Sequence, residues 1–226
     1  QGLYGTPLQI EANFSQDKFL NLPKDNWRLS NAIAPVGPLT ATGIHLVDLS
    51  VSFFGKPIGV TARLGSRGAG FENGDTLAVF LEFDCGAVAL ISAILATPFD
   101  GRFALYGSKG WSEIRDRTHP ESPSGWDVSK VIRGDEASKV FYKPHQAVLE
   151  NLEAFGHAIR GHAPYPVDNN QKRYTVAALL RPLLRRFQVG VWKLLKSDGP
   201  KALTSNFLIR PPKPRRIKLM AVISLK

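Results

Sequence analysis

The stretch DTLAVFLEFDCGAVALISAILAT, residues 75–97, decides the fold class. It contains two apolar runs, 75–84 and 86–97, which are separated only by the tight turn around Cys85. Strands joined by so short a turn are antiparallel neighbours in a sheet. Both runs are apolar at nearly every position, so we expect both faces of the sheet to be covered, the second by another domain or another subunit. Residues 86–96 are too few to span a bilayer, and no transmembrane helix is expected.

The sequence on either side continues this architecture. Alternation of apolar and polar residues predicts strands at 8–15, 58–66, 101–110 and 111–116, and a further hairpin at 130–134 and 138–143. Helices are expected at 37–55, which starts with Gly-Pro and ends with Gly, at 145–161, and from about 165 onward. The second helix has an apolar face made by Val148, Leu149, Leu152, Phe155 and Ile159. The fold class is therefore α+β, an open and mostly antiparallel sheet with helices packed on one face.

Charge is distributed unevenly along the chain. Residues 1–170 carry 15 Lys and Arg against 18 Asp and Glu, whereas residues 171–226 carry 14 Lys and Arg and only Asp198. A single cysteine, Cys85, excludes an internal disulfide and is typical of a reducing compartment, so a cytoplasmic location is expected. The first residues lack the pattern of a signal peptide.

Several kinds of chemistry are excluded by the motifs. No group of His, Cys, Asp and Glu has metal-ligand spacing, and there is no Ser-His-Asp signature or nucleophile elbow. The glycine-rich GSRGAG, residues 65–70, lies between two expected strands with no helix after it. It therefore lacks the helix N-terminus that would hold a pyrophosphate, and no cofactor-binding residue is assigned.

Five segments occur in an informative order: 5–15, 26–63, 75–93, 102–116 and 151–167. Together they resemble the C-terminal domain of the glucose-fructose oxidoreductase / inositol dehydrogenase (Gfo/Idh/MocA) family, over roughly residues 2–179. The resemblance implies an open sheet like that of the C-terminal domain of dihydrodipicolinate reductase. It also implies hydride transfer between NAD or NADP and a hydroxyl-bearing carbon of a sugar, cyclitol or related polyol.

In that family an N-terminal Rossmann domain binds the cofactor, and the open sheet makes the oligomer. Neither the Rossmann glycine motif nor the family's Glu-Lys-Pro motif occurs here, and the chain begins with Gln1 rather than Met. We therefore expect a truncated chain that is inactive alone, binds a small polyol or sugar, forms a homo-oligomer through the sheet face, and needs no metal. The alternative is a non-catalytic oligomerisation or interaction module.

By this resemblance, His45 occupies the position of the family histidine that exchanges the proton of the reacting hydroxyl. An imidazole is suited to this role because its pKa lies near neutrality. Asp48 follows three residues later on the same helix face, where it would orient the ring or contact substrate. The competing interpretation is a buried histidine bonded to backbone beside a surface aspartate. Many family members carry an aspartate four residues before the histidine, and this chain has Ala41 there.

The remaining candidate substrate contacts lie before the histidine. Trp27 and Arg28 match the Trp-Arg pair of the family, where the indole would stack on a sugar ring and the guanidinium would bind a hydroxyl or carboxylate. Thr40 and Thr42 flank Ala41 and are further candidates. The competing interpretation has the Trp packed under a long loop and the Arg in a surface salt bridge.

The C-terminal segment departs from the family pattern. Pro182 falls where a helix interior is expected, and the excess of basic residues begins nearby. A reading-frame shift near Leu180 would explain both features, so we divide the chain into a substrate domain at 1–187 and a basic tail at 188–226. Taken at face value, RPPKPRRIK in the tail would bind nucleic acid non-specifically. We do not favour this, because the rest of the chain has no basic face.

Overall fold

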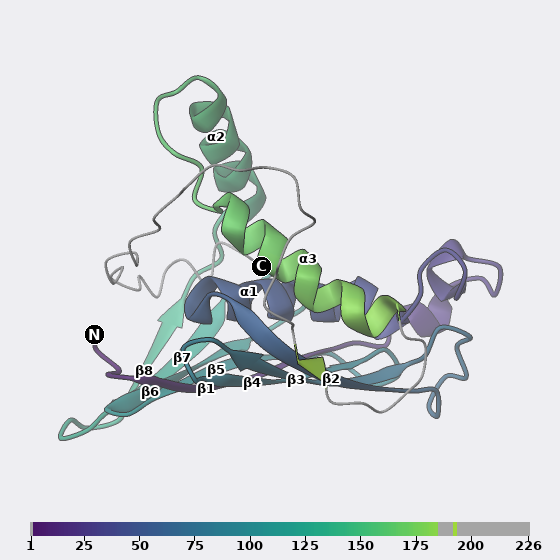
Figure 1. The fold of residues 1–226 in the computed structure, drawn as a ribbon, viewed down its shortest axis with the longest axis horizontal. Helices are drawn as coiled ribbons and strands as arrows, with labels where there is room; N and C mark the ends of the chain where they lie inside the picture. Colours follow the sequence, from purple (N-terminus) through teal and green to yellow (C-terminus); the bar gives the residue numbers. More distant parts are fainter. Residues whose placement is uncertain (1, 185–191, 194–226) are drawn as a thin grey trace.

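The structure is a computed structural model that describes residues 2–184, 192 and 193. The domain boundary expected at 187 lies outside the described residues, and so does the basic tail at 188–226 except for two residues. The predicted α+β class is confirmed: helices lie on one side of a single curved sheet (Figure 1). None of the helices in the described part is long and apolar enough to cross a membrane.

The sheet has nine strands in the order β8-β7-β6-β5-β1-β4-β3-β2-β9 within the described residues. The strands are β1 (Pro7–Ser15), β2 (Pro57–Gly65), β3 (Thr76–Phe83), β4 (Val88–Ile94), β5 (Asp100–Gly107), β6 (Gly110–Asp116), β7 (Trp126–Ile132), β8 (Ser138–Tyr142) and the two-residue β9 (Trp192–Lys193). The pairs joined by short turns are antiparallel, as expected. The first strand lies between β4 and β5 and is parallel to β4, which the order of the sequence does not indicate.

Alternation along the strands sorts side chains onto two faces. Ile10, Ala12 and Phe14 of β1 are buried, and the registers place them beside Ala89 and Ile91 of β4 and beside Phe103 and Leu105 of β5. This set forms the core under the helices. The opposite face carries Leu90, which is 44% exposed, and an ion-pair network centred on Arg102 with Glu11 and Glu113. In the part of the chain that the structure describes, the helices cover one face only, and the predicted cover of the other face by another domain or subunit stays a prediction.

The helical elements are η1 (Lys18–Asn21), η2 (Trp27–Leu29), η3 (Leu39–Gly43), α1 (Ile44–Phe54), α2 (Ala147–Ile159) and α3 (Asn169–Leu184). The helix expected over 37–55 is divided into a π-helical turn, η3, and α1. It ends as predicted at Gly55, whose φ of 78° is the left-handed conformation that favours glycine. The backbone of α3 continues through Pro182 to Leu184.

Aromatic side chains fix α1 on the sheet. Phe53 stacks on Phe103 of β5 with ring centroids 5.6 Å apart, and Phe54 meets Phe83 of β3 edge to face at 5.4 Å. α3 lies across α1 on the side away from the sheet (Figure 1). This packing places the first turn of α1, and His45 with it, above the end of β1.

Candidate active site

The start of the α1 segment is built around one buried asparagine. Asn73 is fully buried, and its Nδ2 donates to the carbonyls of Arg28 and Ala34, each at 2.7 Å. The backbone carbonyl of Asn73 accepts a hydrogen bond from the Gly37 amide at 2.7 Å. A Cβ on Gly37 would lie 2.9 Å from the Asn73 side chain, so a glycine is required there. The preceding Val36 has φ 54°, a left-handed conformation that is strained for a β-branched residue.

A second buried polar side chain, Asp75, lies two residues after Asn73 and binds the glycine-rich stretch. This buried carboxylate accepts backbone N–H bonds from Arg67, Gly68, Ala69 and Gly70, at 2.7 to 3.2 Å. Burial raises the pKa of Asp75, but these hydrogen bonds and one from the Thr76 hydroxyl outweigh it and hold that pKa below its ordinary value. The glycine-rich stretch at 65–70 therefore binds an anion, but the anion is the chain's own carboxylate.

His45 lies in the first turn of α1, and its side chain is exposed. Its ring lies 6.4 Å from that of Phe14 at the end of β1. Of the two interpretations left open by the sequence, the sealed core histidine is therefore not what the structure contains.

A second histidine, His119, contacts the same phenylalanine. Its ring lies 5.8 Å from Phe14, and its side chain is 15% exposed. Nδ1 lies 3.1 Å from Lys18 Nζ and accepts the Glu121 amide at 3.2 Å, so Nε2 carries the proton and donates to Gln16 Oε1 at 2.8 Å. Burial and the Lys18 charge lower the pKa of His119, which favours the neutral ring. No periodic pattern or motif singles out His119, because it lies in an irregular loop.

Asp48 faces α3. One carboxylate oxygen accepts the Thr175 hydroxyl at 2.7 Å, and Gln171 Nε2 lies 3.3 and 3.4 Å from the two oxygens. These contacts join α1 to a helix more than a hundred residues later. They give Asp48 a role in holding α1 in place, whether or not it also orients His45.

The two threonines differ in access. Thr42 is 1% exposed and donates its hydroxyl to the Pro38 carbonyl at 3.2 Å. Thr40 is exposed, and its hydroxyl donates to the Gly37 carbonyl at 3.2 Å. Thr40 is thus accessible to a ligand, whereas Thr42 is committed to the backbone of the π-helical turn.

Trp27 and Arg28 lie in η2, on the loop that Asn73 anchors. Trp27 is 50% exposed, and the guanidinium of Arg28 lies 4.4 Å from the centre of its indole ring. The guanidinium covers one face of the indole. The other face of the indole and the edge of the guanidinium are left exposed to solvent. Trp27 therefore does not pack under the loop, and Arg28 forms no salt bridge with any described residue.

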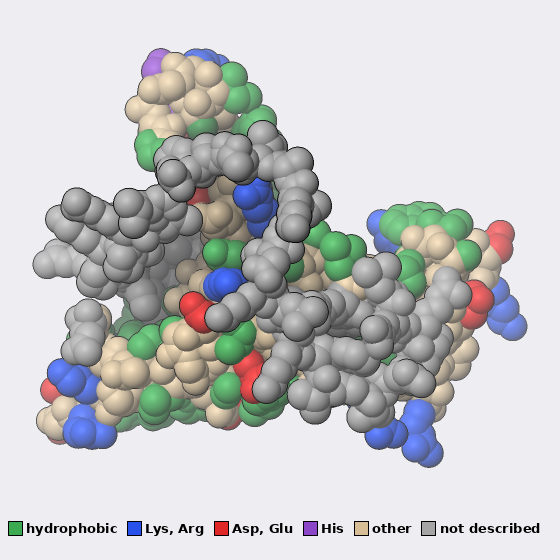
Figure 2. Space-filling model, viewed as in Figure 1, with side chains coloured by type: hydrophobic (Ala, Val, Ile, Leu, Met, Phe, Trp, Pro, Cys, Tyr) green, Lys and Arg blue, Asp and Glu red, His purple; other side chains and the backbone are tan. Residues whose placement is uncertain are grey.

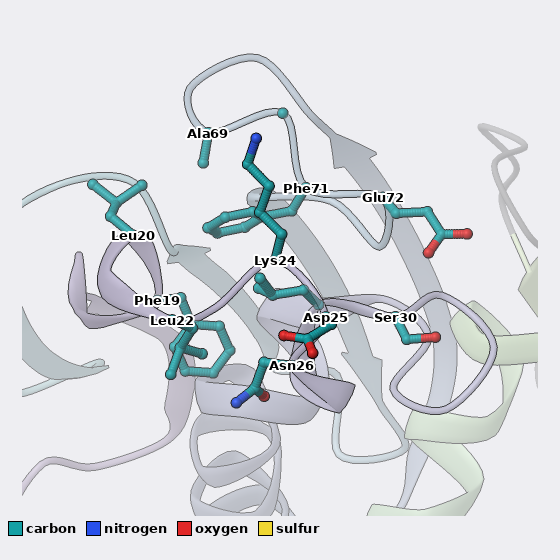
Figure 3. A pocket seen from close by; sticks show the side chains of 12 residues that line it. Phe19, Leu20, Leu22, Lys24, Asp25, Asn26, Ser30, Ala69, Phe71 and Glu72 are labelled. Carbon is teal, nitrogen blue, oxygen red and sulfur yellow. The ribbon is translucent and has the colours of Figure 1, made fainter.

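A hollow of about 590 Å³ lies behind this loop. Figure 3 shows that its lining comes from two segments, 19–30 and 69–72, and that Lys24 lies beside Phe71 between them. None of the residues predicted to act on substrate lines it. Ala69 and Gly70 line this hollow, and their amides donate to Asp75, so Asp75 fixes the position of that part of the lining.

Residues 1–113 match the GFO/IDH/MocA C-terminal domain family. The chain belongs to this family. The matched part contains β1, η2, η3, α1, β2 to β5 and the first residues of β6, and so includes Trp27, Arg28 and His45. The role that the resemblance implies for His45 stays a prediction.

Named relatives are oxidoreductases. The chain is 28% identical over 116 residues to the uncharacterized oxidoreductase YdgJ of Escherichia coli K12, a match that covers 49% of this chain and 31% of YdgJ. The aldose-aldose oxidoreductase of Caulobacter crescentus, solved with glycerol, has a TM-score of 0.65 and 20% identity, over 85% of this chain and 57% of that one. A 3-ketoreductase of Actinomadura kijaniata, solved with NADP and TDP-benzene, has a TM-score of 0.63 and 18% identity, over 80% and 54%.

The chain thus spans about a third of the curated relative and just over half of the two solved structures. The two structures share its fold. Within residues 2–184, 192 and 193, no group of three or more His, Cys, Asp and Glu is placed to hold a metal ion. The backbone amides of the glycine-rich stretch at 67–70 bind Asp75.

Proposed function

We propose that this chain is the substrate domain of an NAD(P)-dependent oxidoreductase that acts on a hydroxyl of a sugar, cyclitol or related polyol. The observation that carries the proposal is the exposed His45 beside Phe14, in a domain of the Gfo/Idh/MocA family. The similar structure of an aldose-aldose oxidoreductase solved with glycerol supports the class of substrate, and the 3-ketoreductase solved with NADP supports the cofactor. The single cysteine is consistent with a reducing compartment such as the cytoplasm.

In the proposed reaction the carbon loses a hydride, with its electron pair, to the nicotinamide. The hydroxyl on that carbon loses its proton to His45, and a carbonyl group forms. An exposed imidazole is suited to exchange this proton because the ordinary pKa of imidazole lies near neutrality. Arg28 and Thr40 are the accessible polar groups of the predicted set, and we assign them to contacts with the other hydroxyls of the substrate. The cofactor is held by a nucleotide-binding domain outside the described residues, so the chain alone is inactive.

The test supplies that domain. The part of the Actinomadura 3-ketoreductase that this chain does not match is joined ahead of Gln1, NADP binding is verified by fluorescence, and NADPH formation is measured with a panel of polyols and sugars. We expect turnover that falls about 10²- to 10⁴-fold in His45→Ala, since this is the usual contribution of a general base. His162→Ala, a change of another exposed histidine, serves as the matched control. An NADP-binding protein that oxidises none of the substrates would favour the non-catalytic module instead.

We also propose that the uncovered sheet face forms a homo-oligomer. Its exposed apolar residue Leu90 neighbours Glu11 of β1 in register, next to the ion pairs of Arg102. A surface with both an apolar and a self-complementary charged part suits a two-fold interface. Light scattering of the chain should show a dimer or larger assembly, and Leu90→Glu should give monomers. A chain that is monomeric at tens of micromolar would contradict this part of the proposal.

A further inference from the structure

Gln16 is a buried side chain whose amide group is satisfied at one end only. It follows directly after β1 and is 7% exposed, and its backbone amide donates to the Ile94 carbonyl at 2.8 Å. Its side-chain Oε1 lies 2.8 Å from His119 Nε2, whereas its own Nε2 donates to no described residue. The NH₂ group of a carboxamide carries two donors, and leaving both without an acceptor in a buried side chain costs free energy.

His119 determines which end of this amide faces it. Its Nδ1 meets two groups that can only donate, the Glu121 backbone amide at 3.2 Å and the Lys18 ammonium at 3.1 Å. Nδ1 is therefore the acceptor, and the single proton of the neutral ring lies on Nε2. An N–H at Nε2 requires an acceptor, so Gln16 turns its oxygen toward His119 and its NH₂ group away.

The surroundings of His119 hold this arrangement in place. The rings of Phe14 and Phe99 lie 5.8 and 5.4 Å from the imidazole. Lys18 forms an ion pair with Glu121, which ties the segment after β1 to the loop of His119. Both charged side chains are well exposed, and Figure 2 shows charges of both signs on the lobe that carries η1 and η2. The ion pair is thus the outer end of a chain of hydrogen bonds that runs inward to the buried amide.

The NH₂ end of the amide lies on the side of the sheet that carries His45. Side chains two residues apart on a strand leave the same face, so Gln16 emerges beside Phe14, whose ring lies 6.4 Å from that of His45. Among the described residues, Asn73 Oδ1 is the only fully buried side-chain nitrogen or oxygen without a partner. Gln16 Nε2 is therefore not sealed in the core, and its donors are accessible to a ligand beside Phe14.

We propose that Gln16 binds the substrate through its NH₂ group, and that His119 is the positioning residue that fixes the amide in this orientation. The inference rests on the proposed function, because it takes the presence of a substrate beside Phe14 from the role of His45. A group that can only donate binds an oxygen with a lone pair, such as a hydroxyl or a ring ether, and cannot bind an ammonium group. Gln16 and His119 would therefore select polyols and sugars over their amino analogues at this position.

The first measurement reads the tautomer of His119 by NMR in the full chain, labelled with nitrogen-15 in its histidines and glutamines. Near pH 7 we expect a neutral ring with its proton on Nε2. His119→Phe identifies the signal, because it removes it and keeps an aromatic ring against Phe14 and Phe99.

The second measurement follows the side-chain NH₂ signals of Gln16 while the same chain is titrated with glycerol, or with its diamino analogue, in which amino groups replace both terminal hydroxyls. The wild type should bind glycerol at least about tenfold more tightly than the diamine, and Gln16→Glu should reverse this preference. His119→Phe should bring the ratio of the two dissociation constants near one, because a released amide can turn its oxygen toward an ammonium group. A purely structural role of His119 would leave this ratio unchanged.

Two controls accompany the titrations. Gln9→Glu makes the same change on the opposite face of β1, and it should leave the ratio at the wild-type value. Slow hydrogen exchange of the β3 and β4 amides verifies that each variant is folded.

Each outcome decides one part of the inference. A proton on Nδ1, or a doubly protonated ring near pH 7, would overturn the positioning role of His119, as would an unchanged ratio in folded His119→Phe. NH₂ signals of Gln16 that do not respond to glycerol would overturn its role in substrate binding. Neither measurement requires NADP or turnover. A joined protein that forms no NADPH would therefore overturn the catalytic proposal alone, and a failure here would leave the role proposed for His45 standing.

Discussion

Replacing Asp75 with asparagine should destabilise the domain far more than the loss of one surface charge. In the wild type, one carboxylate oxygen accepts the amides of Gly68, Ala69 and Gly70, and the other accepts the Arg67 amide and the Thr76 hydroxyl. An asparagine has one acceptor oxygen, and its NH₂ group must then face donors. In the better orientation, the amide oxygen of the asparagine still accepts from Gly68, Ala69 and Gly70, but it is neutral. The NH₂ group then faces the Arg67 N–H, so that hydrogen bond is lost.

The size of the effect follows from these contacts. Hydrogen bonds to a charged group contribute about 1.5 to 3 kcal/mol each, and neutral ones about 1 kcal/mol. Weakening three bonds and losing a fourth should lower the free energy of unfolding by about 3 kcal/mol. With a urea m-value of about 2 kcal/mol/M, the unfolding midpoint falls by about 1.5 M. The matched control is Asp84→Asn, which makes the same change at an exposed turn and should stay within about 0.5 kcal/mol of the wild type.

The effect should also depend on pH, with a sign fixed by the lowered pKa of Asp75. Because the folded pKa lies below the unfolded one, the carboxylate stabilises the fold fully above the unfolded value, near pH 4. That contribution is lost as the pH falls through the folded pKa. The difference between wild type and Asp75→Asn should therefore be constant from about pH 5 to 8 and shrink below about pH 4. A difference under about 1 kcal/mol at pH 7, or one equal to that of Asp84→Asn, would refute the reasoning.

Two further predictions concern buried polar groups near the site. Asn73→Ala removes both donors to the carbonyls of Arg28 and Ala34 and should lower the free energy of unfolding by about 2 to 3 kcal/mol in urea titrations. Asn73→Asp should lower the free energy of unfolding at least as much, since a carboxylate cannot donate. An unchanged free energy of unfolding in either variant would contradict the anchoring role of Asn73. His119 has a lowered folded pKa, so the unfolded chain takes up its proton first as the pH falls. Its contribution to stability should be present above the unfolded value, near pH 6.5, and decline below it, whereas His119→Gln should not show that decline, as urea midpoints at several pH values would reveal.

The strands and the two long helical segments could be predicted from the sequence because their hydrophobic periods are regular. The residues 75–97 give β3 and β4 within a few positions, and Gly55 ends α1 where expected. The place of β1 could not be predicted. An isolated strand before the first helix can pair with any edge, and only packing inserts it beside β4 in parallel. The division of 37–55 into η3 and α1 depends on Asn73, which lies in a different turn.

The candidate site shows the same limit. His45 stands among apolar neighbours, so the period of the helix alone cannot tell an exposed ring from a buried one. The partners of Asp48 on α3 are 123 and 127 residues away, beyond any local pattern. A usable signal existed for Asp75. A glycine-rich stretch followed closely by an aspartate matches an anion-binding turn that closes on its own carboxylate, as the structure has it.

The anchoring of the site has a consequence for how the proposed enzyme would work. The loop with Trp27 and Arg28, the strained Val36 and the start of α1 are all held by groups inside this domain, chiefly Asn73. Strain at Val36 persists only because these contacts over-determine it. The substrate side of the site is therefore formed before any nucleotide-binding domain docks. A nucleotide-binding domain that carries the cofactor would then meet an α1 whose position is already fixed by contacts inside this domain, including those of Asp48 with Thr175 and Gln171.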